Sequence, residues 1–281
     1  MKFNIVLIQP ANYPHSYSVL EICQLLHFSL IDLGHTSTLT RNYLESGAIN
    51  IVFCGHLLPN DASTQIPADT IFFNSEQLPR NGMGWVSTIF NQASKFKMFD
   101  YSSENALELT KRLNYDVPVL KIGFHAGLRR IMFNQDKDID VLFYGSLNSR
   151  RKNCLESLIK SGLTVKTLFG VYGAERDEWV ARSKLVLNLH YYEAKILEVV
   201  RIFYLLTNSV PVVTEVSAET KVEGDILDFV ASSDYGQLEE RCLELCQFPE
   251  KAMQIGSRGY EGFCKRNQRD FTEELVDQLL F

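Results

Sequence analysis

The sequence lacks several features that would assign the protein to a class at once. No stretch of its 281 residues is apolar over the length that a membrane-spanning helix requires. The net charge of −6 gives no basic excess that would indicate DNA or RNA as the main partner. The first residues carry one lysine before a short apolar run that Gln9 and Pro10 stop, so we expect no signal peptide. These absences predict a cytoplasmic protein without a transmembrane segment.

Redox motifs and paired metal ligands are also scarce. The six cysteines form no Cys-x-x-Cys pair, and several, such as Cys54, lie inside apolar runs. We therefore expect buried free thiols rather than disulfides or a metal site. We also expect no Mg²⁺ or Mn²⁺ site. This expectation rests on the premise that the chain has no paired carboxylates at the spacing that holds a nucleotide-bound metal.

An alternation of apolar strands and amphipathic helices is present instead. Apolar residues make up 46% of the chain and charged residues 22%, as in globular proteins with one large or two modest domains. Alternating strands and helices predict parallel sheets with helices on both faces. In the first half, the predicted strands are residues 3–8, 49–54, 70–74, 96–100 and 117–122, and the predicted helices are 19–33 and 103–113.

A second alternating series follows a charged segment, residues 124–139, that suits a linker. Its predicted strands are 140–144, 164–169, 185–189, 210–213 and a weak one at 228–230, and its helices are 150–161, 175–182, 193–206, 235–247, 249–263 and 271–281. We therefore predict an α/β protein with two Rossmann-like, doubly wound parallel-sheet domains, residues 1–125 and 126–281, that face a cleft. The last helix is expected to be able to pack back on the first domain.

Ligands of such sheets gather at the carboxyl ends of the strands. In the first half this rule selects polar residues that follow the predicted strands: Asn12, His15, Ser16, His56, Asn74, Glu76, Asp100, Ser102 and His125. From this set we single out His15 as a candidate general base, and Glu76 and Asp100 as candidate catalytic carboxylates. Helix capping is the structural alternative for both carboxylates.

Three aromatic residues in predicted loops extend this set: Tyr13, Tyr17 and Trp85. Exposed rings at such positions can stack on a sugar or a base. Packing against the domain is the alternative for each ring, so these residues add candidates for acceptor binding without identifying an acceptor.

The predicted strand 140–144 ends in a turn, Gly145-Ser146, that leads into a helix carrying Arg150 and Arg151. A strand, a small-residue turn and a helix start together hold phosphate groups, because backbone N–H groups and the helix dipole face the anion. Positively charged side chains at a helix start are repelled by the positive end of the helix dipole. A bound anion would offset this repulsion and explain their position. A solvated basic patch is the alternative.

The predicted helix 193–206 is apolar nearly all round, and Glu198 and Arg201 share one of its faces. We expect these two to form an ion pair, which is costly inside a protein unless further hydrogen bonds complete it. A bound ribose or phosphate would provide them. Asn188 and His190 end the preceding strand and Glu193 opens the helix, so all three join the predicted donor site, with packing or capping as the alternative.

These segments together resemble the GT-B class of glycosyltransferases, in particular group-1-like proteins of bacteria and phages. The resemblance is carried by DVLFYGSLNSRRK, SKLVLNLHYYEAKILEVVRIFYLL and NSVPVVTE in the second half, and by FFNSEQL and FDYSSEN in the first. It implies that the second domain binds a nucleotide diphosphate-sugar and that the first binds the acceptor. It also implies metal-independent transfer, in which basic side chains and a helix start stabilise the departing diphosphate.

Within the resemblance, Gly145-Ser146 and Arg150-Arg151 match the loop that faces the diphosphate. The family has two glutamates eight positions apart that contact the donor sugar and the ribose. Here that spacing from Glu198 falls on His190, and counting back from the proline of the last strand falls on Tyr204. The family's glycine before that strand is Ser209.

Three functions fit this sequence. The first is a hexosyl- or pentosyltransferase that moves a sugar from a UDP- or GDP-sugar to a hydroxyl of a glycan, a lipid-linked sugar, a protein or a modified nucleic acid. The second is a nucleotide-sugar epimerase on the same scaffold, and the third is a non-catalytic nucleotide-binding module. Incubation with the donor alone separates the first two, and no cofactor beyond the nucleotide-sugar is expected.

Overall fold

The computed structural model describes residues 1–59, 66–78, 85–132, 136–192, 195–222 and 224–280. The chain divides into two compact units. Unit 1 comprises Met1–Gly127 and Asn267–Phe281, and unit 2 comprises Leu128–Arg266. Each unit holds one five-stranded parallel sheet.

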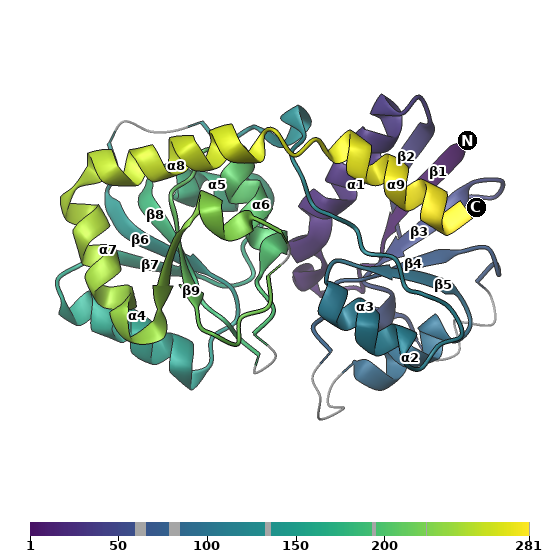
Figure 1. Cartoon of the computed structure of the whole chain (residues 1–281), viewed down its shortest axis with the longest axis horizontal. Coiled ribbons are helices and arrows are strands. Elements are labelled where there is room, and N and C mark those ends of the chain that lie inside the picture. Colours follow the sequence, from purple (N-terminus) through teal and green to yellow (C-terminus); the bar gives the residue numbers. More distant parts are fainter. Residues whose placement is uncertain (60–65, 79–84, 133–135, 193–194, 223, 281) are drawn as a thin grey trace. The chain divides into compact units, whose positions relative to one another are not determined.

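Unit 1 is an α/β layer structure. Its strands are β1 (Lys2–Leu7), β2 (Thr36–Arg41), β3 (Ile49–Phe53), β4 (Ile71–Asn74) and β5 (Lys97–Asp100), and its α-helices are α1 (Leu20–Asp32), α2 (Val86–Ala93), α3 (Ser103–Thr110) and α9 (Gln268–Leu280). The sheet order is β2-β1-β3-β4-β5. Helices α1 and α9 lie on one face and α2 and α3 on the other (Figure 1). Phe73 packs between Phe53 and Phe99, with ring centroids 4.6 and 4.9 Å apart, so aromatic rings fill part of the core.

The structure corrects two sequence predictions in unit 1. Strand β2 was not predicted, because TSTLTR is polar and its strand lies half-exposed at the sheet edge. The strand predicted at 117–122 is wrong. Only one bridge, Asp100 to Val119, forms there, and the preceding Pro118 has no N–H to donate to a ladder.

The carboxyl-terminal helix α9 packs against α1. The Ser29 and Thr272 hydroxyl groups lie 2.7 Å apart between these helices, and both residues are fully buried. The Gln268 side chain accepts a 2.7 Å hydrogen bond from the Gly123 N–H. These contacts fix the last helix of the chain to the first.

Unit 2 repeats the architecture. Its strands are β6 (Ile139–Tyr144), β7 (Val165–Leu168), β8 (Ser183–Asn188), β9 (Val212–Val216) and β10 (Ala231–Asp234), and its α-helices are α4 (Ser149–Lys160), α5 (Gly173–Ala181), α6 (Val199–Thr207), α7 (Leu238–Gln247) and α8 (Pro249–Phe263). The sheet order is β10-β9-β8-β6-β7. Helices α4 and α7 pack with β6, β8 and β9 around a core of buried apolar residues.

The two sheets have the same topology. When the strands of each unit are numbered from its first strand, both orders read 2-1-3-4-5. In such doubly wound sheets the order in which successive strands are added reverses between the first and third strands, which are β1 and β3 in unit 1 and β6 and β8 in unit 2. Ligands bind outside the carboxyl ends of the strands at this reversal. Topology therefore directs attention to the ends of these four strands.

Two predicted elements of unit 2 differ in the structure. The weak strand at 228–230 is wrong: a 3-10 helix (Ile226–Phe229) precedes β10. Helix α6 begins after Glu198 and is shorter than the predicted 193–206. Before it, Leu197 donates from its N–H to Lys221 and Lys195 adopts a φ of 50°, so this segment is held in a non-helical form. Glu193 lies outside the described residues.

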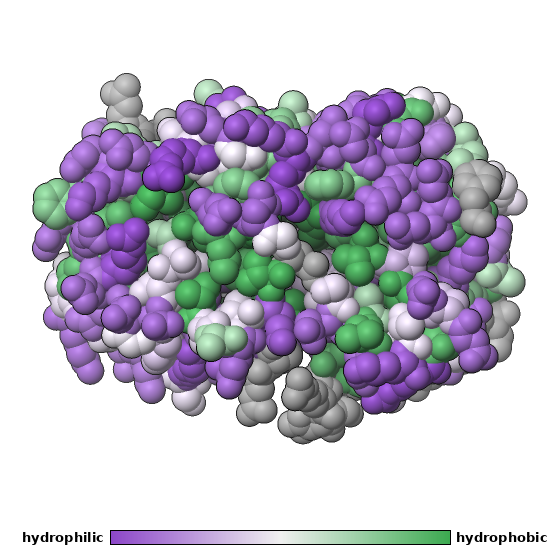
Figure 2. Space-filling model, in the orientation of Figure 1, coloured by the Kyte–Doolittle hydropathy of each residue, from purple (hydrophilic) through white to green (hydrophobic). Residues whose placement is uncertain are grey.

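Hydrophilic residues predominate on the face of the molecule shown in Figure 2. Single large apolar side chains such as Met132 and Met253 are exposed, as is ordinary for a folded chain. Across the ranges that the structure describes, none of the helices has the length and apolarity needed to span a membrane.

The six cysteines carry free thiols, five of them buried and Cys264 partly exposed. Burial raises the pKa of Cys54 and of Cys246 to about 12, and that of Cys154 to about 11. Such thiols are protonated at neutral pH and act as small apolar core groups.

Candidate functional site

The turn after β6 brings the helix α4 arginines to the carboxyl edge of the unit 2 sheet. Gly145 has a φ of +134°, and a Cβ built on it would lie 2.9 Å from Arg201 Nη2 and 3.5 Å from Arg151 Nη1. Only glycine suits this backbone and lets two guanidinium groups lie so close. The Asn148 side chain caps α4 by accepting a 2.9 Å hydrogen bond from the Arg151 N–H.

Arg151 is buried and its guanidinium is held by backbone carbonyls. It donates to the carbonyls of Ser146 at 2.8 Å, of His190 at 3.3 Å, and of Leu189. Burial and the nearby Arg201 lower the pKa of Arg151 to about 10. The sequence placed Arg151 against a phosphate, whereas these contacts make it the residue that ties the β6 turn to the end of β8.

Arg150 forms a two-pronged ion pair with Glu215 at the end of β9. Arg150 Nη1 donates to Glu215 Oε2 at 2.6 Å, and its Nη2 donates to the other oxygen. The same carboxylate accepts a 3.1 Å hydrogen bond from the His190 N–H. The Arg150 side chain remains 38% exposed and lies 3.8 Å from the centre of the Tyr235 ring. Glu215 was missed as a site residue, although a carboxylate directly after an apolar strand was a usable signal.

Asn188 links Glu198 to Arg201. Its Oδ1 accepts a 2.6 Å hydrogen bond from Arg201 Nη1, and its Nδ2 donates to Glu198 Oε2 at 3.0 Å and to Thr214 Oγ1 at 2.9 Å. The predicted direct ion pair between Glu198 and Arg201 is therefore wrong, because an amide group lies between them. The closest guanidinium nitrogen paired with Glu198 is Arg151 Nη2, 3.6 Å from Oε1.

Glu198 and His190 present buried polar atoms to each other at this edge. His190 Nδ1 lies 3.3 Å from Glu198 Oε2, and its Nε2 lies 3.1 Å from Thr220 Oγ1. Burial opposes ionisation of Glu198, but His190, Arg201 and Asn188 outweigh it and lower the pKa of this carboxyl. Within the described residues, Glu198 Oε1 has no hydrogen-bond partner, whereas His190 Nδ1 lies within ion-pair distance of Glu198 Oε2. Buried polar atoms are normally paired, so Glu198 Oε1 is a candidate position for a ligand hydroxyl or amide group.

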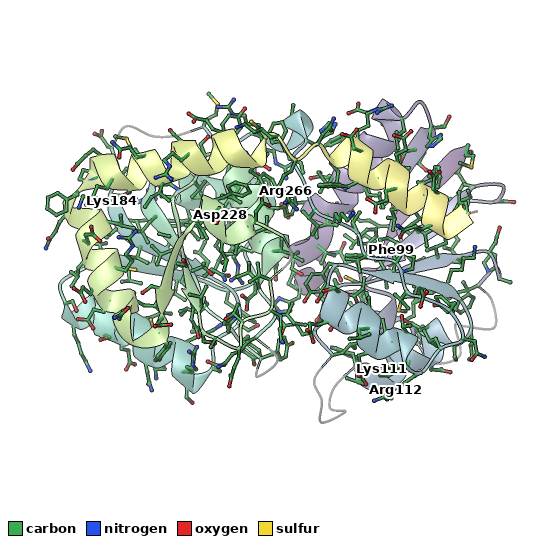
Figure 3. The ribbon with its side chains drawn as sticks, viewed as in Figure 1. Phe99, Lys111, Arg112, Lys184, Asp228 and Arg266 are labelled. Carbon is green, nitrogen blue, oxygen red and sulfur yellow. The ribbon has the colours of Figure 1, made fainter. Side chains whose placement is uncertain are left out.

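Paired carboxylates do occur, and the premise that the sequence has none is wrong. Asp136, Asp138 and Asp140 form two overlapping Asp-x-Asp pairs at the amino end of β6. Asp140 Oδ1 accepts from Lys184 Nζ at 2.6 Å, and Lys184 is labelled in Figure 3. Asp138 accepts from Arg182 Nε at 2.9 Å. No group of three or more His, Cys, Asp or Glu residues suited to a metal ion occurs in the part of the chain that the structure describes.

In unit 1, Asp100 is fully buried at the end of β5 and saturated with donors. Asn74 Nδ2 donates to it at 2.6 Å, the Ser102 N–H at 2.8 Å and Asn105 Nδ2 at 3.1 Å. Burial raises the pKa of Asp100 to about 7, although these hydrogen bonds oppose the rise. The contacts fit a group that joins β4, β5 and the start of α3.

Glu76 lies beyond the end of β4 and His56 beyond the end of β3. Glu76 Oε1 lies 3.8 Å from His56 Nε2. Burial raises the pKa of Glu76 and lowers that of His56 to about 4. His15, on the 3-10 helix Pro14–Val19, stands edge-on to Tyr13 with ring centroids 5.2 Å apart. The strand-end rule thus places Glu76 and His56 beside each other.

The chain was compared with known proteins. No protein-family model matches it. The uncharacterized proteins L137 and L138 of Acanthamoeba polyphaga mimivirus are 28% and 25% identical to it over 186 residues. Both matches cover 62% of this chain but 24% and 20% of the viral proteins, so the chain spans about a quarter or less of these relatives.

Solved structures are similar along the whole chain. Anabaena HepE in complex with UDP-glucose is 12% identical with a TM-score of 0.63, covering 99% of each chain. T4 phage BGT in complex with its UDP-glucose substrate, and WaaG, a glycosyltransferase involved in lipopolysaccharide biosynthesis, are each 11% identical with a TM-score of 0.62, covering 100% of each chain. The chain has the GT-B glycosyltransferase fold.

The predicted fold class is confirmed, since the two five-stranded parallel sheets with interleaved helices are those of the GT-B fold. Several unit 2 residues were selected from the sequence as donor-site candidates. Those that the structure describes lie together at one edge of the sheet. Residues that sequence reasoning missed complete the network: Thr214, Glu215, Thr220 and Tyr235. They are distant in sequence from their partners, and only the sheet register brings them together.

Proposed function

We propose that the protein is a glycosyltransferase that moves a hexose or pentose from a UDP- or GDP-sugar to an acceptor hydroxyl without a metal ion. One observation carries the proposal. Glu198 Oε1 is buried without a hydrogen-bond partner in the described residues, beside an arginine cluster at the β6/β8 reversal. An unpaired buried acceptor and nearby cations are what a ribose diphosphate requires. The solved structures of HepE and T4 phage BGT, which share the fold, are complexes with UDP-glucose.

In this proposal the residues of unit 2 divide the donor between them. Glu198 accepts a hydrogen bond from a ribose hydroxyl, and Asn188 and His190 hold Glu198 in place. Arg201, whose Nη2 lies against Gly145, and the exposed edge of Arg150 bind the diphosphate together with the N–H groups of the Gly145-Ser146 turn. Guanidinium groups fixed in this way stabilise the negative charge that develops on the leaving diphosphate.

Phe169 is our candidate for stacking on the donor base. It follows directly after β7, whose carboxyl end lies beside that of β6, and its side chain is 60% exposed. Exposed aromatic rings bind bases by stacking, and such contacts tolerate different bases. This residue was not singled out from the sequence.

The acceptor belongs to unit 1 in this proposal, with His15, Glu76 and Asp100 as the groups predicted from the sequence to assist the acceptor. Asp100 is the weakest of the three candidates, because it is fully buried and both of its oxygens already accept hydrogen bonds within the protein. A glycan, a lipid-linked sugar, a protein and a modified nucleic acid remain the acceptor classes to test.

Nucleotide release in the presence of EDTA tests the proposal. The protein is incubated with UDP-glucose and, in parallel, with GDP-mannose, and the products are followed by mass spectrometry. We expect release of UDP or GDP, and a loss of at least tenfold in Glu198→Gln. Glu178→Gln, an exposed substitution on α5, serves as the matched control.

Each alternative has its own outcome in the same assay. A changed sugar still attached to its nucleotide indicates an epimerase. Thermal stabilisation by UDP or GDP without turnover indicates a nucleotide-binding module. Absence of both turnover and stabilisation contradicts the proposal.

A further inference from the structure

A second group of polar and aromatic side chains lies at the carboxyl edge of the unit 1 sheet. His56 follows β3 and Tyr13 follows β1, so both lie at the strand reversal where doubly wound sheets bind ligands. Glu76 follows β4, the next strand along the sheet. The position corresponds in topology to the donor edge of unit 2.

His56 is held rigidly by the turn that carries it. A Cβ built on Gly55 would lie 2.4 Å from a carbon of the Phe72 ring, so only glycine lets this turn pack on β4. Gln92 Nε2 donates a 2.6 Å hydrogen bond to the Gly55 carbonyl. Cys54 adopts a left-handed φ of 57°, a conformation that costs free energy for a residue with a side chain and persists where the surroundings enforce it.

Glu76 is fixed through its backbone while its carboxylate stays open. Its N–H donates to Asn74 Oδ1 at 3.1 Å, and its carbonyl accepts from Asn74 Nδ2 and Asn105 Nδ2, each at 2.9 Å. The side chain is 30% exposed, and in the described residues only His56 Nε2, at 3.8 Å, pairs with the carboxylate. Asp100, one strand away, accepts three hydrogen bonds. Asp100 therefore holds neighbouring segments of the fold together, whereas the Glu76 carboxylate is available to a ligand.

An exposed aromatic ring lies beside His56. The Trp85 ring is 46% exposed and lies 5.1 Å from the His56 ring, centroid to centroid, at an angle of 43°. Burial and the charge of Glu76 raise the pKa of Tyr13. An exposed indole face beside hydrogen-bonding groups suits the apolar C–H face of a pyranose ring, whose hydroxyl groups project at its edge.

We infer that Trp85, His56 and Glu76 form a saccharide-binding site in unit 1, in which the indole ring stacks on a pyranose and one hydroxyl group contacts both His56 and Glu76. A hydroxyl oxygen about 2.8 Å from each of two atoms that are 3.8 Å apart has ordinary hydrogen-bond geometry. It donates to the carboxylate and accepts from the imidazole. The inference rests on the proposed function, in which this saccharide is the acceptor.

The charge of the site favours a neutral sugar over nucleic acid. Neither Glu76 nor Trp85 makes an ion pair or cation–π contact with a lysine or arginine in the described ranges. A phosphate backbone beside the Glu76 carboxylate would meet repulsion and lack the cations that bind it. A stacked base without backbone contacts remains the competing ligand, and the test includes it.

Saturation-transfer difference NMR on the full chain tests the site. The probes are methyl glucopyranosides, galactopyranosides and mannopyranosides in both anomeric forms, and a single-stranded oligonucleotide is the competitor class. We expect at least one glycoside to bind, with affinity reduced about tenfold in Glu76→Gln and in Trp85→Ala, and largely retained in Trp85→Phe. Glu108→Gln on α3, half-buried as Glu76 is, and Tyr43→Ala, which is exposed, are the matched controls.

UDP titrations of the same variants separate this inference from the proposed function. If glycosides bind and respond to the variants while UDP and GDP do not bind, the saccharide site stands and the transferase proposal fails. If UDP or GDP binds but no glycoside shows a signal that Glu76→Gln or Trp85→Ala weakens, the saccharide site is overturned. It is also overturned if the oligonucleotide alone depends on Trp85. Unchanged melting temperatures exclude unfolding as the cause.

Discussion

The two sheets have one strand order but differently built carboxyl edges. In unit 2 the edge carries three arginines interlocked with Glu198 and Glu215, and most of their hydrogen-bonding groups are satisfied within the protein. In unit 1 the corresponding edge carries aromatic rings and the open carboxylate of Glu76. The two units thus have equivalent strand-end edges whose side chains differ in charge. In our proposals, an anionic donor suits unit 2 and a neutral hydroxyl compound suits unit 1.

The largest expected effect comes from removing the buried cation of unit 2. Arg151→Met leaves the carbonyls of Ser146 and Leu189 without their donor and removes one of the cations near Glu198. We expect the free energy of unfolding to fall by about 3–5 kcal/mol, because a buried pair is broken and buried carbonyls lose their donor. Urea denaturation measures the change.

Lys152→Met is the matched control for that variant. Lys152 is the next residue on α4, exposed, and lies 3.7 Å from Glu156. Its removal is expected to cost less than about 0.5 kcal/mol. Equal effects of the two substitutions would mean that the unit 2 arginines are a surface patch.

The saturated carboxylate of unit 1 is expected to make stability depend on pH. Burial raises the pKa of Asp100 from 3.8 to about 7, so the folded protein binds this proton more tightly than the unfolded chain. The contribution is therefore full below about pH 4 and is lost as pH rises toward 7, by roughly 4 kcal/mol. Melting temperatures between pH 4 and 8 should show this slope in the wild type, and Asp100→Asn should remove it. An unchanged slope in the variant would contradict the assignment.

A smaller effect is expected from the exposed ring of unit 2. Phe169→Ala should weaken UDP binding by about 1–2 kcal/mol through lost stacking and leave the melting temperature unchanged, because the ring is 60% exposed. Phe169→Tyr should retain the affinity. Calorimetric titration of UDP measures the affinity of both variants. Equal affinities of the wild type and Phe169→Ala would mean that the base does not stack on Phe169.

The smallest effect tests the attachment of α9 to unit 1. Lys121 Nζ lies 2.8 Å from both carboxylate oxygens of Glu274, and both side chains are exposed. Lys121→Met should change the free energy of unfolding by no more than about 0.5 kcal/mol. Thr272→Val, which removes the buried hydroxyl contact with Ser29, should cost about 1–2 kcal/mol. If urea denaturation shows a larger loss for Lys121→Met than for Thr272→Val, the surface ion pair and not the buried hydroxyl contact attaches α9 to unit 1.

Local patterns predicted much of this molecule. Apolar runs located eight of the ten strands in the described residues, and the polar edge strands β2 and β10 gave no such signal. The Gly145 turn, Asn188 and Glu198 were found because strand ends and helix starts are visible in sequence. Glu215 was not found, since it lies 65 positions from its partner Arg150 and the two meet only through the sheet register. Asp100 looked like a catalyst because its donors Asn74 and Asn105 come from other segments.

The central claim is that the β6/β8 edge of unit 2 binds a nucleoside diphosphate through Glu198. Isothermal titration calorimetry of UDP and of GDP in EDTA, on the wild type and on Glu198→Gln, tests it most directly. The account predicts binding of at least one of them to the wild type and affinity at least tenfold weaker in the variant, at a temperature where both proteins are folded. Equal affinity in both proteins, or binding by neither nucleotide, would contradict it.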